Sequence, residues 1–429
     1  MYPVPFPLSP SLWAATASAA PASEKLSENL SCDVLVIGGG YAGLSTALHM
    51  AEKGINVVLL EAREIGFGGS GRNGGQVIPG LKYDPDDLIK MFGEERGKWL
   101  VNFAGQTAQS VFDLIDRHQM DVPHVRKGWI QGAHTEDGLK LAKQRAEQWS
   151  KHGAKVQFLD RAQTQELLGT ERYLGGWVDE RAGAVQPLSY ARGLARAAQA
   201  AGVRIHTDSP VAALKHHAAK WTAQTTTGFS VQAERVVMCT NAYCGDLWPE
   251  LKPTIIDANT FQVATRPLPD HIKKTILPQG HVSSDTRNLL LYFRLDHTGR
   301  LLMGGRGPFR EPKGHSDWAH LERVIKKLFP QAANEPYEYR WCGRVAVTRD
   351  YLPHLHEPAP GLLIDIGCMG RGVGLQTSMG KAMANFIATG DKDALPFAPR
   401  PIKPFPLYAM RRLYVNAVVT WYRLNDGGV

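Results

Sequence analysis

Residues 33–62 read DVLVIGGGYAGLSTALHMAEKGINVVLLEA, and this stretch decides the fold. Val34 to Ile37 form a short apolar run that predicts a buried parallel strand, and three glycines interrupt it. Residues 44–53 then predict a helix that ends at Gly54, and residues 55–60 predict a second strand. The stretch therefore predicts a βαβ unit with a right-handed crossover.

The glycines of this unit predict a dinucleotide site. Gly38, Gly40 and Gly43 follow the G-x-G-x-x-G spacing between strand and helix. Such glycines permit the tight turn, the approach of a pyrophosphate to the backbone and close helix–strand packing, in that order. The helix N-terminus offers unpaired N–H groups to the phosphates. Glu61 ends the second strand, where an acid binds ribose hydroxyls and disfavours the 2′-phosphate of NADP.

Two further glycine-rich segments favour FAD over NAD. Residues 66–76, GFGGSGRNGGQ, suit neither strand nor helix, but they suit a backbone that wraps closely around a ligand. Residues 367–374, GCMGRGVG, separate an apolar strand from a helix. Their N–H groups and the helix dipole are placed to meet a second negatively charged part of the cofactor, such as a reduced flavin.

The composition is that of an ordinary globular protein, with 43% hydrophobic and 21% charged residues. The net charge of +8 raises nucleic acid as a partner, but Lys and Arg are scattered or stand in pairs, so we expect none. No run of about 18 apolar residues occurs, so no membrane span is predicted. The five cysteines are an odd number without a CxxC pair, which favours a reducing compartment and a cytoplasmic protein.

The rest of the chain predicts a mixed α/β fold of two discontinuous domains. Helices are expected at 94–118, 136–152, 189–201, 321–328 and 375–389, and strands at 203–207, 235–240, 289–295, 300–305 and 361–366. A Rossmann-like FAD-binding domain with a parallel sheet is expected from residues 31–90, 188–250 and 338–398, and a substrate domain with an antiparallel sheet from 91–187 and 251–337. Residues 399–429 form a C-terminal extension.

The first 30 residues are expected to form an extended arm on the surface. Residues 12–20, LWAATASAA, are apolar and end in small side chains, like an export signal. No Lys or Arg precedes them, so the charged region of such a signal is missing.

A carboxylate clamp is predicted on the strand at 289–295. Alternation places Tyr292 and Arg294 on one face and a plain apolar set on the other. A phenol and a guanidinium together suit a carboxylate, and Arg306 lies just past the next strand, in reach of both. The alternative is that Arg294 points to solvent or pairs with a structural carboxylate. His354 and His356 lack acidic or thiol partners, so we expect surface-loop histidines and no metal.

The segments VIGGGYAGLSTALHMAEKG, LLEA, IGFGGSGRNGGQ and the glycine loop after residue 366 resemble the D-amino-acid-oxidase (DAO) superfamily of FAD-dependent oxidoreductases. Within it, they resemble the γ-glutamylputrescine oxidase and L-pipecolate oxidase branches. The resemblance runs from about Ser11 to the C-terminus. It implies that FAD lies against Gly38, Gly40, Gly43, Glu61, Ser70, Gly71, Arg72, Asn73, Gly74, Gly75, Gln76, Val211, Gly370, Arg371, Gly372, Val373 and Gly374. Arg371 departs from the family, because relatives usually carry histidine there.

The resemblance also implies the reaction. Hydride passes from the carbon beside a neutral amine to flavin N5, the imine hydrolyses, and oxygen reoxidises the flavin with release of H2O2. The expected substrate is a small amine or amino acid with a carboxylate, either a cyclic amino acid such as L-pipecolate or a γ-glutamylputrescine-like amine.

Several alternatives stay open. Leu302 stands near where sarcosine-oxidase relatives carry an oxygen-activating lysine, so a dehydrogenase that passes electrons to another acceptor is one of them. Cys342 falls near the flavin-linking cysteine of those relatives, although we expect a buried thiol and non-covalent FAD. A tRNA-modifying flavoenzyme and a non-catalytic flavin-binding protein are the others. The oligomeric state is not predicted.

Overall fold

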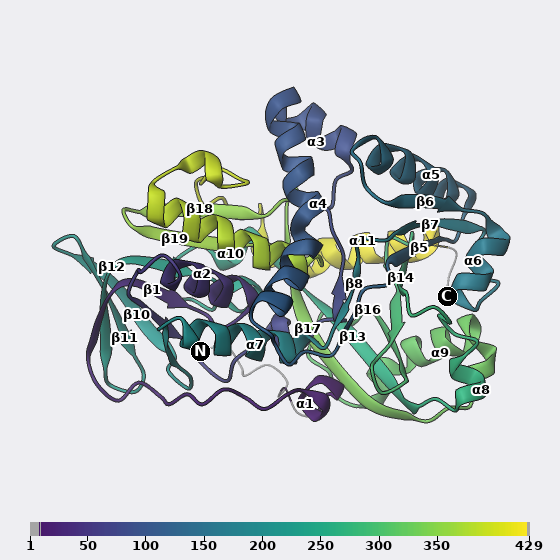
Figure 1. Cartoon of the computed structure of the whole chain (residues 1–429), viewed down its shortest axis with the longest axis horizontal. Helices are drawn as coiled ribbons and strands as arrows, with labels where there is room; N and C mark the ends of the chain where they lie inside the picture. Colours follow the sequence, from purple (N-terminus) through teal and green to yellow (C-terminus); the bar gives the residue numbers. More distant parts are fainter. Residues whose placement is uncertain (1–7, 9, 427–429) are drawn as a thin grey trace.

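The computed structural model describes residue 8 and residues 10–426. The remainder of the expected arm, residues 1–7 and 9, and the last three residues of the expected extension lie outside the described residues. Two large sheets lie side by side, a parallel-centred sheet at the left of Figure 1 and a mostly antiparallel one at the right. The mixed α/β fold expected from the sequence is confirmed.

The first sheet gathers strands from distant parts of the chain. Its centre is β1 (Leu30–Ile37), which pairs in parallel with β2 (Val57–Leu60) and β12 (Ser230–Met238). Strand β9 (Arg204–His206) extends it beyond β2, and β19 (Leu362–Ile366) pairs in parallel with β12. Antiparallel neighbours β10 (Val211–His217), β11 (Lys220–Thr225) and β18 (His354–Ala359) complete it. The helices α2 (Tyr41–Ala51), α7 (Pro187–Ala200) and α10 (Gly372–Thr389) pack together, with α2 between the other two.

The second sheet has eight strands in the order β17 (Tyr337–Thr348), β13 (Ile255–Pro267), β16 (Arg300–Arg306), β15 (Tyr292–Leu295), β14 (Val282–Asp285), β5 (Trp129–Ala133), β7 (Gly175–Asp179) and β6 (Val156–Leu159). A small third sheet joins β3 (Gln76–Val77), β8 (Gly183–Val185) and β4 (His124–Val125). The helix α4 (Glu94–Arg117) stands between the two large sheets, and α5 (Glu136–Lys151), α6 (Arg161–Leu168) and α9 (Ala319–Leu328) lie on the right. Two further helices are α3 (Pro85–Phe92) and the single-turn α8 (Asp270–Lys273).

Three expectations need correction. Residues 338–348 belong to the antiparallel sheet and not to the FAD-binding part, because β17 pairs along its length with β13, some 80 positions earlier in the chain. Residues 12–16 form the helix α1 (Leu12–Thr16), and the Trp13 side chain is fully buried, so this part of the expected arm is not an extended surface segment. Its apolar side chains pack with Leu188 and Trp341, whereas residues 18–23 are irregular.

His354 and His356 are the third correction, because they lie in β18 and are buried rather than in a surface loop. His354 Nε2 lies 2.7 Å from an Asp350 carboxylate oxygen. Burial lowers the pKa of His356 to about 4, so this ring is neutral at physiological pH.

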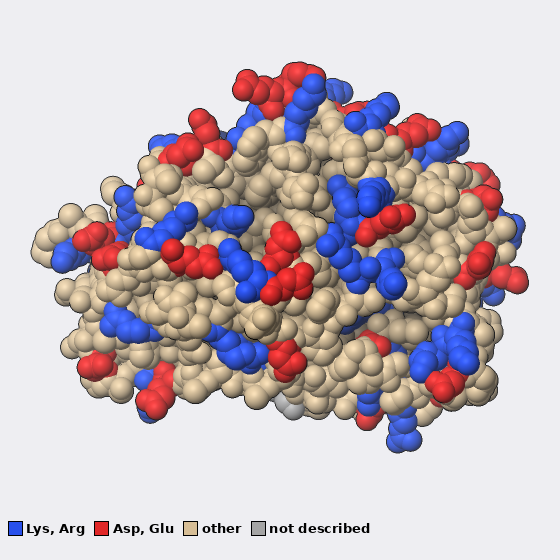
Figure 2. Space-filling view, in the orientation of Figure 1, with Lys and Arg blue, Asp and Glu red and all other residues tan. Residues whose placement is uncertain are grey.

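On the face drawn in Figure 2, basic and acidic side chains are interspersed. Within residues 10–426, no helix is both long and apolar enough to cross a bilayer.

Candidate active site

The turn between β1 and α2 needs glycine at Gly38 and Gly43. Gly38 has φ +114°, and a Cβ there would lie 2.7 Å from the carbonyl oxygen of Cys239. A Cβ on Gly43 would lie 2.0 Å from the carbonyl oxygen of Gly38, so the helix packs against its own turn as expected. At Gly40 the nearest atom to an added Cβ is Ser70 Oγ, at 3.0 Å. The backbone at Gly40 is therefore less crowded by protein than the backbone at Gly38 or Gly43.

Two helices direct uncapped N-termini toward the same region. Neither α2 nor α10 has a side-chain cap at its N-terminus, and neither has an acidic residue in its first turn. Each follows the carboxyl end of a parallel strand, β1 or β19, and the two helices pack against each other. Because the first N–H groups of a helix lack intrahelical partners, these ends suit phosphates and a negatively charged ring edge. The residues present therefore fit the expected dinucleotide cofactor.

Glu61 lies beside the start of α2. Its carboxylate accepts hydrogen bonds from the backbone N–H groups of Gly39 (2.6 Å) and Arg63 (2.9 Å), while burial raises its pKa. Residues 208 and 209 donate backbone bonds to Arg63 and Glu61 (3.0 and 2.9 Å), and half-buried Val211 follows them. Glu61 is therefore bonded to the segment that leads to Val211, and both are positions that the resemblance places against FAD.

The loop at 66–76 is held by its own polar side chains. Asn73 Nδ2 donates to the carbonyl oxygens of Gly69 and Ser70, at 3.0 and 2.9 Å, and its Oδ1 accepts from Gly75 N–H. The buried Arg72 donates from Nε to the carbonyl oxygen of Phe67 at 2.7 Å. These two side chains stabilise the loop from within, and the loop meets the start of α2 through Ser70 Oγ, which accepts from Tyr41 N–H at 3.0 Å.

The antiparallel sheet packs one face against this loop. Leu291, just before β15, and Phe293 within it enter the sheet's hydrophobic core, whereas Tyr292 and Arg294 face the other way, as alternation predicts. A Cβ on Gly74 would lie 2.7 Å from the Tyr292 ring, and one on Gly75 would lie 2.6 Å from Arg294 Nη2. Gly74 and Gly75 therefore allow the loop to contact the sheet closely.

Arg294 is closed in by protein. Its Nη2 donates to the carbonyl oxygen of Val185 at 2.9 Å, and its guanidinium carbon lies 5.0 Å from the centre of the Trp13 ring. Trp13 Nε1 in turn donates to the carbonyl oxygen of Asn73 at 2.7 Å. Burial lowers the Arg294 pKa to about 10. Arg294 neither points to solvent nor forms an ion pair with a described carboxylate; it joins α1, β8 and the glycine loop.

Arg306 differs in having no partner. It is half-buried at the end of β16, and within residues 10–426 its guanidinium has no hydrogen bond or ion pair. Burial lowers the pKa of Arg306, and the nearby cation Arg423 lowers it further. Arg306 pairs in register with Thr260, whose hydroxyl lies 2.9 Å from the hydroxyl of Tyr292. Tyr292, Thr260 and Arg306 therefore share one face of the sheet.

Arg371 and Lys82 lie together, although sequence reasoning did not single out Lys82. Arg371 Nη1 donates to the carbonyl oxygen of Pro79 at 2.6 Å, and its guanidinium carbon lies 5.2 Å from the Trp129 ring centre. The Lys82 side chain keeps exposed surface, yet desolvation by surrounding protein and then Arg371 lower its pKa to about 8. Arg371 thus ties the second glycine loop to the segment after β3. No sequence motif marks Lys82.

Cys342 and Leu302 lie in apolar surroundings. Cys342 is buried in the sheet's hydrophobic core beside Phe261, and burial raises the pKa of its thiol to about 12. Leu302 packs with Trp13 and Trp341. Neither environment favours an ionised group.

Comparisons with known proteins agree with this geometry. A family model described as DAO, FAD dependent oxidoreductase, matches residues 33–386. The Gamma-glutamylputrescine oxidoreductase of Escherichia coli (strain K12) is 32% identical over 97% of this chain and 98% of its own length. Glycine oxidase from Geobacillus kaustophilus has the same fold, with a TM-score of 0.73 at 22% identity over 87% of this chain and 99% of its own. L-proline dehydrogenase from P. horikoshii also has this fold, with a TM-score of 0.71 at 19% identity over 90% of this chain and 99% of its own.

Proposed function

Since this chain belongs to the DAO family of FAD-dependent oxidoreductases, we propose that it oxidises the carbon–nitrogen bond of a small amine that also carries a carboxylate. It is an oxidoreductase of the amine and amino-acid type. Beyond this reaction class, we propose that the substrate has a carboxylate, and we propose which residues bind that carboxylate and which electron acceptor is used.

The free guanidinium of Arg306 is the observation that supports a carboxylate on the substrate. A half-buried arginine normally has an anionic or carbonyl partner, and this one has none within residues 10–426. The cation Arg423 acts on it as well, so the local field favours an anion. We therefore assign the carboxylate to Arg306 with Tyr292, and give Arg294 the role of holding the glycine loop. This changes the sequence-based clamp, in which Arg294 was the principal cation.

FAD, when bound, would supply the acceptor for a hydride, which carries both electrons of the substrate C–H bond. The chain's own residues bind and orient. Gly38, Gly40 and Gly43 with the uncapped α2 N-terminus would hold the pyrophosphate, and the uncapped α10 N-terminus would stabilise negative charge on the flavin. Tyr292 and Arg306 hold the substrate carboxylate on the sheet face above the loop at 66–76. The amine must be neutral for its lone pair to assist C–H cleavage, so turnover should rise with pH until the bound amine is deprotonated.

For the substrate, a γ-glutamylated amine and a cyclic amino acid such as L-pipecolate both satisfy the carboxylate requirement. The near full-length similarity to an E. coli protein named for γ-glutamylputrescine supports the first. A peroxide-coupled screen of purified protein with γ-glutamylputrescine, free putrescine, L-pipecolate and L-proline tests the proposal. Turnover of the carboxylate-bearing compounds, faster at alkaline pH, is expected. Turnover of putrescine alone at an equal rate would contradict the carboxylate requirement.

A second candidate activity is that of a dehydrogenase. The apolar packing of Leu302 against two tryptophans supports it, because no lysine stands there to assist oxygen. Repeating the screen with an artificial electron acceptor and without oxygen distinguishes the two. Substrate-dependent dye reduction without peroxide formation in air would favour the dehydrogenase.

Non-covalent FAD is the proposed state. The Cys342 thiol lies on the core face of β17 with a raised pKa, so its reactive thiolate is scarce. Acid precipitation is expected to release all flavin into the supernatant. Flavin fluorescence that migrates with the polypeptide on a denaturing gel, and is lost in Cys342→Ser, would contradict this.

We also propose that the enzyme acts in the cytoplasm. All five cysteines are free and buried, which suits a reducing compartment.

A further inference from the structure

We propose that the C-terminal helix α11 (Arg411–Asn425) docks the protein on the surface of an anionic lipid bilayer. In Figure 1 this helix, in yellow, runs horizontally across the middle of the view. No residue of α11 is buried. The lipid contact does not depend on which amine the enzyme oxidises.

The outward face of α11 is apolar. Leu413, Trp421 and Leu424 are 66%, 60% and 76% exposed, and Ala417 is exposed between them. The spacing of these four residues places them on one helix face. Leu407 and Met410, just before the helix, are also exposed. Such a continuous exposed stripe is unlike the scattered exposed apolar residues of ordinary surfaces.

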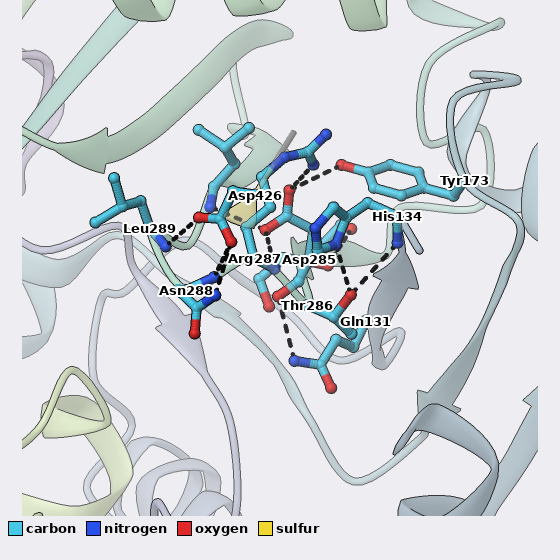
Figure 3. Close-up of polar contacts among 12 residues, drawn as sticks. Gln131, His134, Tyr173, Asp285, Thr286, Arg287, Asn288, Leu289 and Asp426 are labelled. Carbon is cyan, nitrogen blue, oxygen red and sulfur yellow. Dashed lines mark hydrogen bonds and ion pairs between the residues drawn. The ribbon is translucent and has the colours of Figure 1, made fainter. Parts of the chain in front are cut away.

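The stripe is fixed in its outward orientation. Val415, Val419 and Tyr422 lie on the opposite face of the helix and are half-buried against the protein. The helix ends at Asp426, whose buried carboxylate accepts hydrogen bonds from the backbone N–H and side-chain amide of Asn288 and from Leu289 N–H, all at 2.8–2.9 Å. Figure 3 shows this carboxylate among its three donors.

The turn that receives Asp426 is held by further polar contacts. Asp285, buried beside it, accepts from the N–H of Leu291 at 3.1 Å and forms an ion pair with Arg287 (Figure 3). His134 Nδ1 lies 2.9 Å from the Thr286 hydroxyl in the same cluster. Because Asp426 directly follows α11, rotation of the helix to bury its stripe would break the Asp426 bonds. The apolar stripe is therefore a stable feature of the folded surface.

The charged residues near the stripe indicate what binds to it. From residue 399 to residue 425 the chain has no Asp or Glu, and its basic residues are Arg400, Lys403, Arg411, Arg412 and Arg423. Only Arg400 of these forms an ion pair with a described residue. A second copy that used the same helix across a two-fold axis would bring arginines against arginines. A helix with an apolar face, a tryptophan and flanking arginines, but no acids, instead fits the interface of an anionic bilayer.

The test uses the full-length, flavin-loaded protein in sedimentation with vesicles. Wild type should bind vesicles of phosphatidylcholine mixed with phosphatidylglycerol, bind phosphatidylcholine alone at least about tenfold more weakly, and dissociate as salt rises. The triple variant Leu413→Gln, Trp421→Gln, Leu424→Gln should bind mixed vesicles at least about tenfold more weakly. Its flavin absorbance and turnover should stay those of wild type, since none of these side chains belongs to the active site.

Two further variants sharpen the result. Met91→Gln removes an exposed apolar side chain (46% exposed) from α3, outside the stripe, and should leave vesicle binding unchanged. Trp421→Phe should still bind, but it should lose the part of the fluorescence blue shift that wild type shows on mixed vesicles. Absence of wild-type binding, or equal binding by the triple variant, overturns the proposal. A wild-type dimer that the triple variant converts to monomer, without vesicle binding, would show that a second copy covers the stripe instead.

Discussion

The Gly40→Val protein is expected to purify folded but colourless. The nearest protein atom to a Cβ on Gly40 is Ser70 Oγ at 3.0 Å, and the further methyl groups of valine extend into the space that the pyrophosphate needs. Ser70 Oγ also accepts from the N–H of Tyr41 at 3.0 Å, so the same change disturbs the N-terminus of α2. FAD affinity should fall by roughly 10²-fold or more, a loss of about 2.7 kcal/mol. Absorbance near the flavin band after reconstitution with excess FAD measures it.

The matched control is Gly314→Val. An added Cβ at Gly314 meets nothing within 4 Å, and its backbone is extended with φ −175°, so valine fits there without strain. This variant should keep full flavin occupancy. A Gly40→Val protein that melts like wild type and binds FAD with wild-type affinity would show that the cofactor lies elsewhere.

Local patterns predicted the parts of this fold whose contacts are close in sequence. The β1–α2–β2 unit needed only an apolar run, a glycine turn and a second run, and its crucial contact, Gly43 against Gly38, spans five residues. Helix α4 starts at Glu94 and ends one residue before the expected end. The face on which Tyr292 and Arg294 lie followed from alternation alone, although β15 is shorter than the expected strand.

The missed features depend on partners far away in the chain. Trp13 is buried because it meets Arg294 and Asn73, and nothing near residue 13 indicates those contacts. The hydroxyl of Ser11, which accepts from the N–H of Ala14, was a readable helix-start signal before LWAAT. β17 was placed in the wrong domain because its partner β13 lies some 80 positions earlier. The neighbour of Arg306, Arg423, could not be inferred from either segment alone.

The two arginines on the substrate face should respond differently to substitution. Arg306→Ala is expected to lower kcat/KM for the carboxylate substrate by roughly 10²-fold, because a charge-assisted contact in a sheltered site is worth a few kcal/mol. The kcat/KM of Arg306→Lys should lie between those of wild type and Arg306→Ala, since a point charge attracts the carboxylate without the planar fork that orients it. Arg294→Ala removes the bond to Val185 and the stacking on Trp13, so it should loosen the glycine loop and weaken FAD binding.

The discriminating measurement is kcat/KM on the carboxylate substrate and on its decarboxylated amine, at saturating FAD. If Arg306 binds the carboxylate, Arg306→Ala should lose far less on the decarboxylated amine, which never used that contact. If Arg294 holds the loop, Arg294→Ala should lose a similar factor on both molecules, together with FAD affinity. A carboxylate-selective loss at Arg294 with normal FAD affinity, and proportional losses at Arg306, would return the clamp to Arg294. The Lys variants separate charge from geometry at whichever position proves selective, because only the residue that touches the carboxylate is rescued in part by lysine.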